Sequence, residues 1–304
     1  MANPLYGRNV VSIKDFKKNE LEYLFEQVDT NFDASNRNDL HHHTLGLLFF
    51  EPSTRTRLSF DSAITSLGGN SISLAETNLS SIEKGENLTD TIKTLEQYVN
   101  AIVIRHSMEG SAKFAAEISN IPIINAGSGT EEHPTQAMLD LYTIKKEKGT
   151  LDNLEIGILG DLKYSRTVYS LIYALSHYSS KIHLISPPSL SIRNDLLVEL
   201  KDKISIHEYD NVEEVLDELD ILYVTRIQKE RFPDMQEYQN VQGSYKVDSK
   251  LLEQSKDNLI LMHPFPRTGE IDSELDSTDK AKYFNQIKYG KLLRAELLRL
   301  VLTE

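Results

Sequence analysis

The chain has 304 residues, of which 39% are hydrophobic and 26% are charged, and its formal net charge is −13. This composition is typical of a globular protein of two domains, and the acidic balance excludes the basic face that nucleic-acid binding normally needs. The apolar runs are too short for a membrane helix, the N-terminus lacks the apolar core of a signal peptide, and without cysteine there is no disulfide or thiol nucleophile. We therefore expect a cytoplasmic protein.

Short apolar runs that fit strands alternate with amphipathic stretches that fit helices. The predicted strands are Leu45–Phe50, Asn70–Leu74, Ala101–Arg105, Pro122–Asn125, Glu155–Gly160, Ile182–Ser186, Ile221–Thr225 and Leu259–His263. The predicted helices include Leu88–Tyr98, Thr135–Lys148, Arg166–Ser176, Val212–Leu219 and Tyr289–Leu302. This alternation predicts an α/β fold with two domains, each a parallel β-sheet flanked by helices on both faces. A polar break at Lys145–Asn153 separates the two halves of the pattern.

Polar or cationic side chains follow six of the predicted strands. The clusters are Ser53–Arg57, Arg105-His106, His133–Gln136, Asp161–Arg166, Thr225–Gln228 and His263–Arg267. In open α/β sheets, ligands bind at the carboxyl ends of the strands. One site at the sheet edges explains the six clusters economically.

The cluster Ser53-Thr54-Arg55-Thr56-Arg57 is the most informative of the six. Ser53 is a good N-cap, and the free N–H groups of a first helical turn attract anions. The threonines add hydroxyl donors, and an arginine fork matches phosphate oxygens. Because residues two apart on a helix do not share a face, Arg55 and Arg57 should have different roles, one on a ligand and one on the protein or a neighbouring subunit. The alternative is a solvated, capped helix start.

Two further clusters carry groups that could act on a carbonyl. Pro134 fits the first position of a helix and His133 its cap, where the helix dipole disfavours protonation of the imidazole. A neutral His133 could donate to a carbonyl oxygen, and Gln136 could reach the same region. Arg105 ends an apolar strand, where its charge needs a ligand or an acid such as Glu51.

In the second half, Arg166 and Arg226 come from separate strand-end loops and suit a substrate with two carboxylates, unless each forms a surface salt bridge. The run His263–Arg267 contains two prolines, which stiffen the loop and present backbone carbonyls in fixed directions. Glycines near residue 160 lack the G-x-G-x-x-G spacing of a dinucleotide site. The three consecutive histidines at 41–43 are interpreted as part of a solvated loop rather than as a metal site.

Together, Ser53–Arg57, His133–Gln136 and the strand-terminal Arg105 resemble the aspartate/ornithine carbamoyltransferase family. The loop Lys84-Gly85-Glu86, the run 225–232 and His263–Arg267 are similar to its aspartate-specific branch. The ornithine-specific branch has a cysteine after the late histidine and a Ser-Met-Gly loop, and this chain has neither. The resemblance runs nearly end to end.

The resemblance implies a reaction and a set of site residues. The carbamoyl group of carbamoyl phosphate would pass to the α-amine of L-aspartate, giving N-carbamoyl-L-aspartate and phosphate, the committed step of de novo pyrimidine biosynthesis. The implied carbamoyl phosphate ligands are Ser53, Thr54, Arg55, Thr56, Ser80, Lys84, Arg105, His133, Gln136, Phe265 and Pro266. The implied aspartate ligands are Lys84, Arg166, Arg226 and Gln228. The implied catalytic residues are Arg55, Thr56, Lys84, Arg105 and His133.

The resemblance also implies the assembly. Residues 1–134 plus 287–304 would bind carbamoyl phosphate and residues 135–286 would bind aspartate, in a homotrimer with shared active sites. Lys84 and Ser80 would reach in from a neighbouring subunit, although Ser81 adjoins Ser80 and leaves the choice of hydroxyl open. Phe265 stands where the family usually has leucine. No cofactor or metal is expected, and the sequence leaves open whether a separate regulatory chain binds.

Three other readings compete with this one. They are a carbamoyltransferase for another amino acid, a catalytically silent homologue and a generic phosphate-binding module. Substrate preference would separate the first hypothesis, because a dicarboxylate needs both Arg166 and Arg226. The presence of Arg55, Lys84 and His133 argues against the second, and the aspartate-side residues argue against the third.

Overall fold

The computed structural model describes residues 3–32, 37–74, 85–130, 132–232 and 234–304. They form two compact units. Unit 1 comprises Met1–Leu139 and Lys288–Glu304, and unit 2 comprises Asp140–Ile287. Helices α5 (Pro134–Lys148) and α10 (Tyr283–Leu302) each contribute residues to both units.

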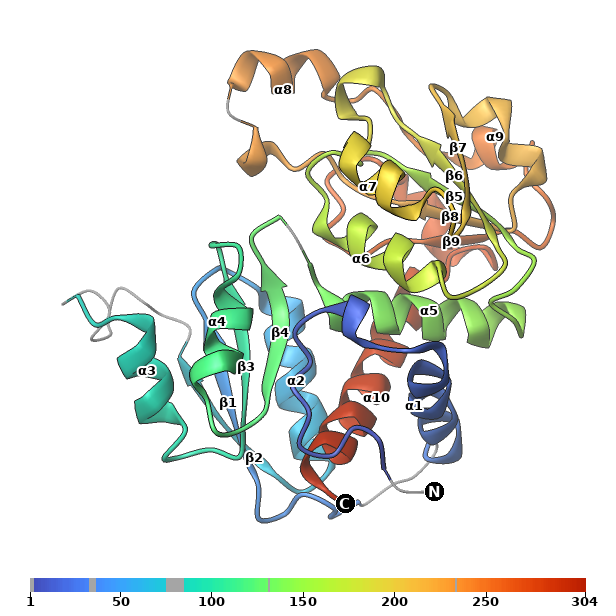
Figure 1. Cartoon of the computed structure of the whole chain (residues 1–304). Coiled ribbons are helices and arrows are strands. Elements are labelled where there is room, and N and C mark those ends of the chain that lie inside the picture. Colours follow the sequence, from blue (N-terminus) through green and yellow to red (C-terminus); the bar gives the residue numbers. More distant parts are fainter. Residues whose placement is uncertain (1–2, 33–36, 75–84, 131, 233) are drawn as a thin grey trace. The chain divides into compact units, whose positions relative to one another are not determined.

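Unit 1 contains a sheet of four strands in the order β2-β1-β3-β4, and every strand pair in it is parallel (Figure 1). Its strands are β1 (Thr44–Phe49), β2 (Asn70–Leu74), β3 (Ala101–His106) and β4 (Ile123–Ser128). Its other helices are α1 (Lys18–Thr30), α2 (Thr54–Ser66), α3 (Leu88–Leu95) and α4 (Ser111–Ile118). The connections are the helical crossovers that parallel strands require.

Both faces of this sheet are buried, so its central strands are continuous apolar runs. Ile102 and Ile104 of β3 pack under α3 and α4 on one face. The neighbouring residues along β3 point to the opposite face, the side on which Figure 1 shows α2 and α10. Gly46 of β1 allows a close approach, because a Cβ there would lie 2.9 Å from a methyl group of Leu95.

Unit 2 contains a five-stranded parallel sheet in the order β7-β6-β5-β8-β9. Its strands are β5 (Glu155–Leu159), β6 (Lys181–Ile185), β7 (Ser205–Tyr209), β8 (Ile221–Val224) and β9 (Ile260–Met262). Its helices are α6 (Arg166–Leu175), α7 (Asn194–Leu200), α8 (Met235–Val241) and α9 (Ser249–Leu252). Unit 2 also contains short 3₁₀ turns at Pro188–Leu190, Val212–Glu214, Leu216–Glu218, Lys229–Arg231 and Ser273–Ser277. Unit 1 contains one at Ile13–Asp15 in its described part.

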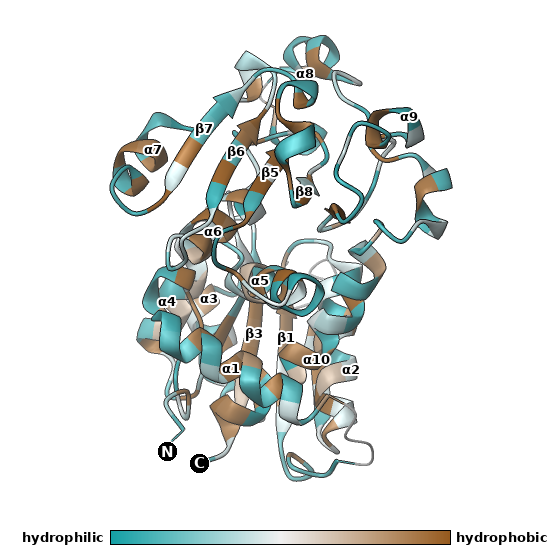
Figure 2. Ribbon diagram, turned by 90° about the vertical axis from the view of Figure 1, so that its right-hand side faces the viewer, coloured by the Kyte–Doolittle hydropathy of each residue, from teal (hydrophilic) through white to brown (hydrophobic). Residues whose placement is uncertain are grey.

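Figure 2 shows the central strands β5, β6 and β8 as largely hydrophobic. Leu222 and Val224 pack against α9 and the turns that precede β8. Where β5 ends, Gly160 has φ +129°, and a Cβ there would lie 2.5 Å from the carbonyl oxygen of Thr225. Glycine therefore allows the ends of β5 and β8 to lie close together at this edge.

The prediction of two domains with parallel sheets flanked by helices is confirmed, with local differences in several elements. Strand β7 was not predicted, because this edge strand is largely exposed and lacks an apolar pattern. Helix α1 was also not predicted, although Leu21, Leu24, Phe25 and Val28 are buried at helical spacing. Helix α10 begins at Tyr283, six residues before the predicted start.

The prediction of a helix over Val212–Leu219 was wrong, because this segment forms two 3₁₀ turns. Val212, Val215, Leu216 and Leu219 are all buried in the same hydrophobic core. A methyl carbon of Leu219 lies 2.4 Å from where a Cβ of Gly157 would be. The segment therefore packs closely against the sheet just before β8 begins. This tertiary packing, rather than the local helical pattern, determines its conformation.

Candidate active site

Three of the predicted clusters lie at the carboxyl ends of three adjacent strands of unit 1. Ser53–Arg57 follows β1, Arg105 lies near the end of β3, and His133 follows β4. Because β1, β3 and β4 are neighbours in a parallel sheet, their carboxyl ends lie at the same edge. The register places the Cα of Arg105 opposite that of Phe49, the last residue of β1.

Helix α2 begins at Thr54, so Ser53 occupies the N-cap position as predicted. Its side chain makes no capping hydrogen bond, and its backbone has φ −157° and ψ 89°. The carbonyl oxygen of Ser53 accepts a hydrogen bond from the backbone N–H of Arg57 at 3.4 Å. The helix therefore does not use the Ser53 hydroxyl to satisfy its own first turn. Thr56 is buried and Arg55 is exposed. A hydroxyl and a helix N-terminus are thus available to an anion here.

Arg105 is held by two neighbours. Its Nη1 donates to the carbonyl oxygen of Ala126 in β4 at 3.2 Å, and its Nε lies 3.4 Å from Oε2 of Glu51. The side chain retains 16% of its exposure. The acid anticipated as its structural partner is therefore present, and the guanidinium is oriented while part of it still faces solvent. Burial lowers the pKa of the neighbouring His106, although the charge of Glu51 opposes this shift.

His133 directly precedes α5, with Pro134 as the first helical residue, as the sequence predicts. Its carbonyl oxygen accepts from the backbone N–H groups of Gln136 at 3.0 Å and of Ala137 at 3.2 Å. His133 and Gln136 are both buried, at 4% and 8% exposure. The imidazole and the amide are therefore fixed at the N-terminal end of a helix, where an anion is stabilised.

In unit 2, three further clusters follow β5, β8 and β9, which are also adjacent strands. Arg166 is the first residue of α6 and is buried at 7% exposure. Arg226 follows β8, and both of its terminal nitrogens donate to the carboxylate of Glu230. Because Glu230 is half exposed, this ion pair is one that another carboxylate could replace. The side chain of Gln228 donates to the carbonyl oxygen of Tyr164 at 3.1 Å.

Asp161 joins the loops that carry these three residues, a role that the sequence did not reveal. Its carboxylate accepts from the backbone N–H of Tyr164 at 3.0 Å and from that of Gln228 at 3.1 Å. Burial raises the pKa of this carboxyl above its ordinary value, although both backbone N–H groups favour the charged form. The sequence signal that could have indicated this role is an aspartate placed directly after a predicted apolar strand.

Both ring nitrogens of His263 form hydrogen bonds within the loop that follows β9. Its Nδ1 accepts from the backbone N–H of Phe265 at 2.8 Å, so its proton is at Nε2, 2.7 Å from Oε1 of Glu270. Burial raises the pKa of Glu270, but the hydrogen bond from His263, the backbone N–H donors and the charge of His263 together outweigh burial, and the net shift is downward. Phe265 has φ +57° and the Phe265–Pro266 bond is cis. The hydrogen bonds of His263 to Phe265 and Glu270 thus hold the backbone of this loop.

Ser80, Ser81 and Lys84 lie outside the residues that the structure describes. In the described ranges, no group of three histidine, aspartate or glutamate side chains is arranged to hold a metal ion. No helix within those same ranges is sufficiently long and apolar to span a bilayer.

The fold and these residues define a class of protein. It is an α/β protein whose parallel sheets each gather arginines and amide or imidazole donors at the carboxyl edge. Such donors bind phosphate and carboxylate groups and stabilise an oxyanion as it forms. The residues fit the transfer of a group between two anionic substrates.

Comparisons with known proteins identify the family. Residues 8–146 match the aspartate/ornithine carbamoyltransferase carbamoyl-P binding domain, and residues 152–301 match the Asp/Orn binding domain of the same family. A protein of Nitrosopumilus maritimus named aspartate carbamoyltransferase catalytic subunit is 54% identical over 99% of both chains. The chain therefore belongs to the aspartate/ornithine carbamoyltransferase family.

Solved structures agree with this assignment. Two are crystal structures of aspartate transcarbamoylase from Trypanosoma cruzi, one with N-(phosphonacetyl)-L-aspartic acid (PALA) and one with carbamoyl phosphate and aspartate. Their TM-scores to this chain are 0.93 and 0.94. Each is 35% identical to it, and each match covers 99% of this chain and 98% of that chain.

Proposed function

We propose that the protein transfers the carbamoyl group of carbamoyl phosphate to the α-amine of L-aspartate, giving N-carbamoyl-L-aspartate and phosphate. The observation that carries the proposal is the set of hydroxyl, guanidinium, imidazole and amide side chains at the ends of the adjacent strands β1, β3 and β4. Relatives over the whole chain are named aspartate carbamoyltransferase, which supports it. The reaction is the committed step of de novo pyrimidine biosynthesis, and the proposed location is the cytoplasm.

The carbamoyl phosphate site is proposed to lie in unit 1. Ser53, Thr54, Arg55 and Thr56 bind the phosphate, because the α2 N-terminus combines free N–H groups with hydroxyl and guanidinium donors. Arg105, His133 and Gln136 hold the carbamoyl group. Phe265 and Pro266 are proposed, as the family resemblance implies, to supply backbone carbonyl groups that accept from the carbamoyl N–H groups.

The aspartate site is proposed to lie in unit 2. Each carboxylate of the substrate takes one guanidinium, from Arg166 or from Arg226, and Gln228 adds an amide. Arg226 exchanges the Glu230 carboxylate for that of the substrate. The corresponding domains are residues 1–134 plus 287–304 for carbamoyl phosphate and residues 135–286 for aspartate.

The chemistry is a direct transfer, because the predicted site residues are donors and cations rather than nucleophiles. The amine nitrogen attacks the carbamoyl carbon, a tetrahedral oxyanion forms, and the bond to the phosphate oxygen breaks. Arg105, His133 and Thr56 stabilise the oxyanion, while Arg55 and Lys84 neutralise the leaving phosphate. The amine proton passes to that phosphate. Cations are required because two anionic substrates would otherwise repel each other.

An assay of two amino acids tests the reaction. Purified protein is incubated with carbamoyl phosphate and either L-aspartate or L-ornithine, and carbamoylated product and released phosphate are measured. We expect carbamoyl aspartate with L-aspartate and no product with L-ornithine. Product from ornithine would overturn the assignment of the amino-acid substrate, and no product from either would favour a catalytically silent homologue.

We propose further that the protein is a homotrimer in which Lys84, and Ser80 or Ser81, complete the site of a neighbouring subunit. A mixing experiment tests this arrangement. Inactive Arg55→Ala and Lys84→Ala chains, refolded together, should regain activity, because some sites then receive a native residue from each chain. Refolding each variant alone is the control. Mixed trimers that form but remain inactive would refute the role of Lys84 between subunits.

A further inference from the structure

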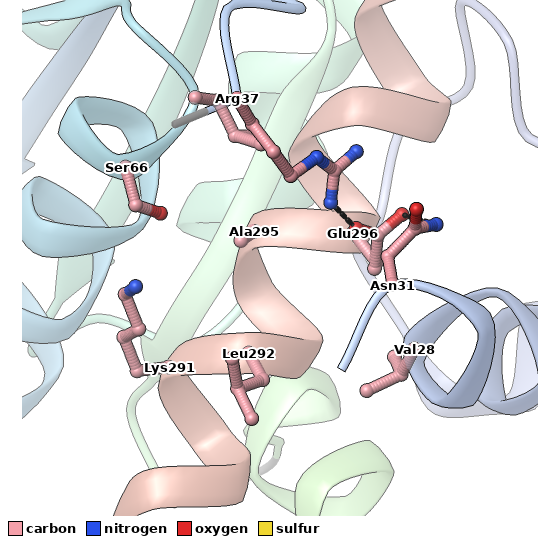
Figure 3. A pocket seen from close by; sticks show the side chains of 9 residues that line it. Val28, Asn31, Arg37, Ser66, Lys291, Leu292, Ala295 and Glu296 are labelled. Atoms are coloured by element: carbon pink, nitrogen blue, oxygen red, sulfur yellow. Dashed lines mark hydrogen bonds and ion pairs between the residues drawn. The ribbon is translucent and has the colours of Figure 1, made fainter. Parts of the chain in front are cut away.

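A pocket lies in unit 1, formed by α1, α2, α10 and the residues before β1 (Figure 3). Its empty volume, which includes space open to solvent, is about 340 Å³. It is lined by Val28, Asn31, Arg37, Ser66, Leu67, Lys291, Leu292, Ala295 and Glu296. None of these residues belongs to the proposed active site.

The described lining of this pocket contains two cationic side chains, Arg37 and Lys291, and one carboxylate, Glu296. Glu296 is the one carboxylate in the described lining, and it is already bound by three donors. Arg37 forms an ion pair with it, Arg299 donates through Nε at 2.8 Å, and Asn31 donates at 3.4 Å. Glu296 is 2% exposed, so this cluster is fixed. Little of its charge is left for another cation.

Lys291 is the cation of the described pocket lining that the Glu296 carboxylate does not pair with. Its side chain extends along the α2 side of the pocket, near Ser66, and away from the Arg37–Glu296 pair (Figure 3). Among the described residues it forms no ion pair or hydrogen bond. Burial lowers its pKa, and no neighbouring carboxylate in the described part of the chain opposes that shift. A half-buried ammonium without a counter-charge is costly, and an anion in the pocket would remove that cost.

We propose that this pocket binds a small oxyanion, a phosphate or a short carboxylate, with Lys291 as its principal cation. Arg37 adds a guanidinium on the opposite side, and its Nε is already held by Asp39 at 2.9 Å. Val28, Leu67 and Leu292 supply apolar walls that fit a short aliphatic chain. The bound anion would link α10 to the C-terminal end of α2.

Chemical labelling of the unaltered protein tests the proposal without depending on the active site. Lysines are reductively methylated with limiting formaldehyde, with and without phosphate at constant ionic strength, and each lysine is quantified by mass spectrometry. A bound anion holds the amine protonated and shields it. At a phosphate concentration of about ten times the dissociation constant, labelling of Lys291 should fall about tenfold. Acetate and butyrate in place of phosphate distinguish the two oxyanion classes.

Lys288 is the internal control, because it is exposed on the same helix and does not line the pocket. Its labelling should not change. Equal labelling of Lys291 with and without every one of these anions would overturn the proposal, as would equal protection of both lysines.

Calorimetric titration of variants gives an independent test. With PALA added to occupy the proposed active site, phosphate should still bind to the native protein and to Lys288→Met. Lys291→Met should bind it about tenfold to a hundredfold more weakly, and Lys291→Arg should restore most of the affinity, because it keeps the charge. Unchanged affinity in folded Lys291→Met would refute the role of Lys291.

Discussion

Replacing Arg105 with alanine is expected to lower kcat about 10²–10³-fold, the usual effect of removing one preorganised oxyanion donor. The guanidinium is oriented by Ala126 and Glu51 while part of it faces solvent. Charge that develops on the carbamoyl oxygen would therefore meet a donor that needs no reorganisation. Steady-state kinetics with saturating carbamoyl phosphate and L-aspartate measure the effect. Lysine at this position should restore only part of the rate, because it lacks the planar fork.

The ion pair with Glu51 offers a competing structural explanation for Arg105, and a matched variant separates the two. Glu51→Gln removes the same ion pair while leaving the guanidinium. Because the pair is only partly buried, each variant should lose about 1 kcal/mol or less of unfolding free energy in urea. If Glu51→Gln reduces kcat as strongly as Arg105→Ala does, Arg105 is a structural partner and not a catalytic residue.

Replacing Arg226 with alanine is expected to lower kcat/KM for L-aspartate about tenfold to a hundredfold, as the loss of a charged hydrogen-bonded pair predicts. Binding of carbamoyl phosphate alone should be unchanged, because its ligands are proposed to lie mainly in unit 1. Titration of the free protein with carbamoyl phosphate, followed by kinetics with varied aspartate, measures both quantities. The variant thus separates the two substrates experimentally.

Arg193→Ala is the control for this experiment. Arg193 is also an arginine of unit 2 with an acidic neighbour, Asp195, whose Oδ1 lies 3.5 Å from its Nε. Its side chain is 48% exposed, and it lies outside the proposed site. An equal loss in both variants would indicate a general effect of charge. If Arg226→Ala leaves kcat/KM unchanged, its ion pair with Glu230 is its main function.

Several features of the proposed site could be predicted because they depend on local chemistry. A continuous apolar run predicts a buried strand, and a proline after a histidine predicts a helix start, so the positions of Arg105 and His133 followed from neighbouring residues. The amphipathic turns at Val212–Glu218 show where this reasoning fails. Their buried residues fit a helix equally well, and only packing over Gly157 selects the tighter turns.

Other features required partners distant in sequence. Asp161 is one residue of a polar loop until the fold brings the backbone N–H of Gln228 to its carboxylate. The pairing of His263 with Glu270 also requires a folded loop, because it depends on the direction in which each side chain points. No local pattern encodes such directions. The excess cation at Lys291 likewise emerges only when three helices enclose it.

The sequence by itself determined which segments are strands at the centre of each sheet, which polar clusters follow them and which chemistry those clusters suit. These properties reside in short stretches, where periodicity and side-chain type act directly. The tertiary structure alone decided the strand orders β2-β1-β3-β4 and β7-β6-β5-β8-β9, which place the clusters of each unit on neighbouring strands. It also decided which charges are already paired. Both depend on contacts between residues far apart in the chain, and their energies come from burial that exists only after folding.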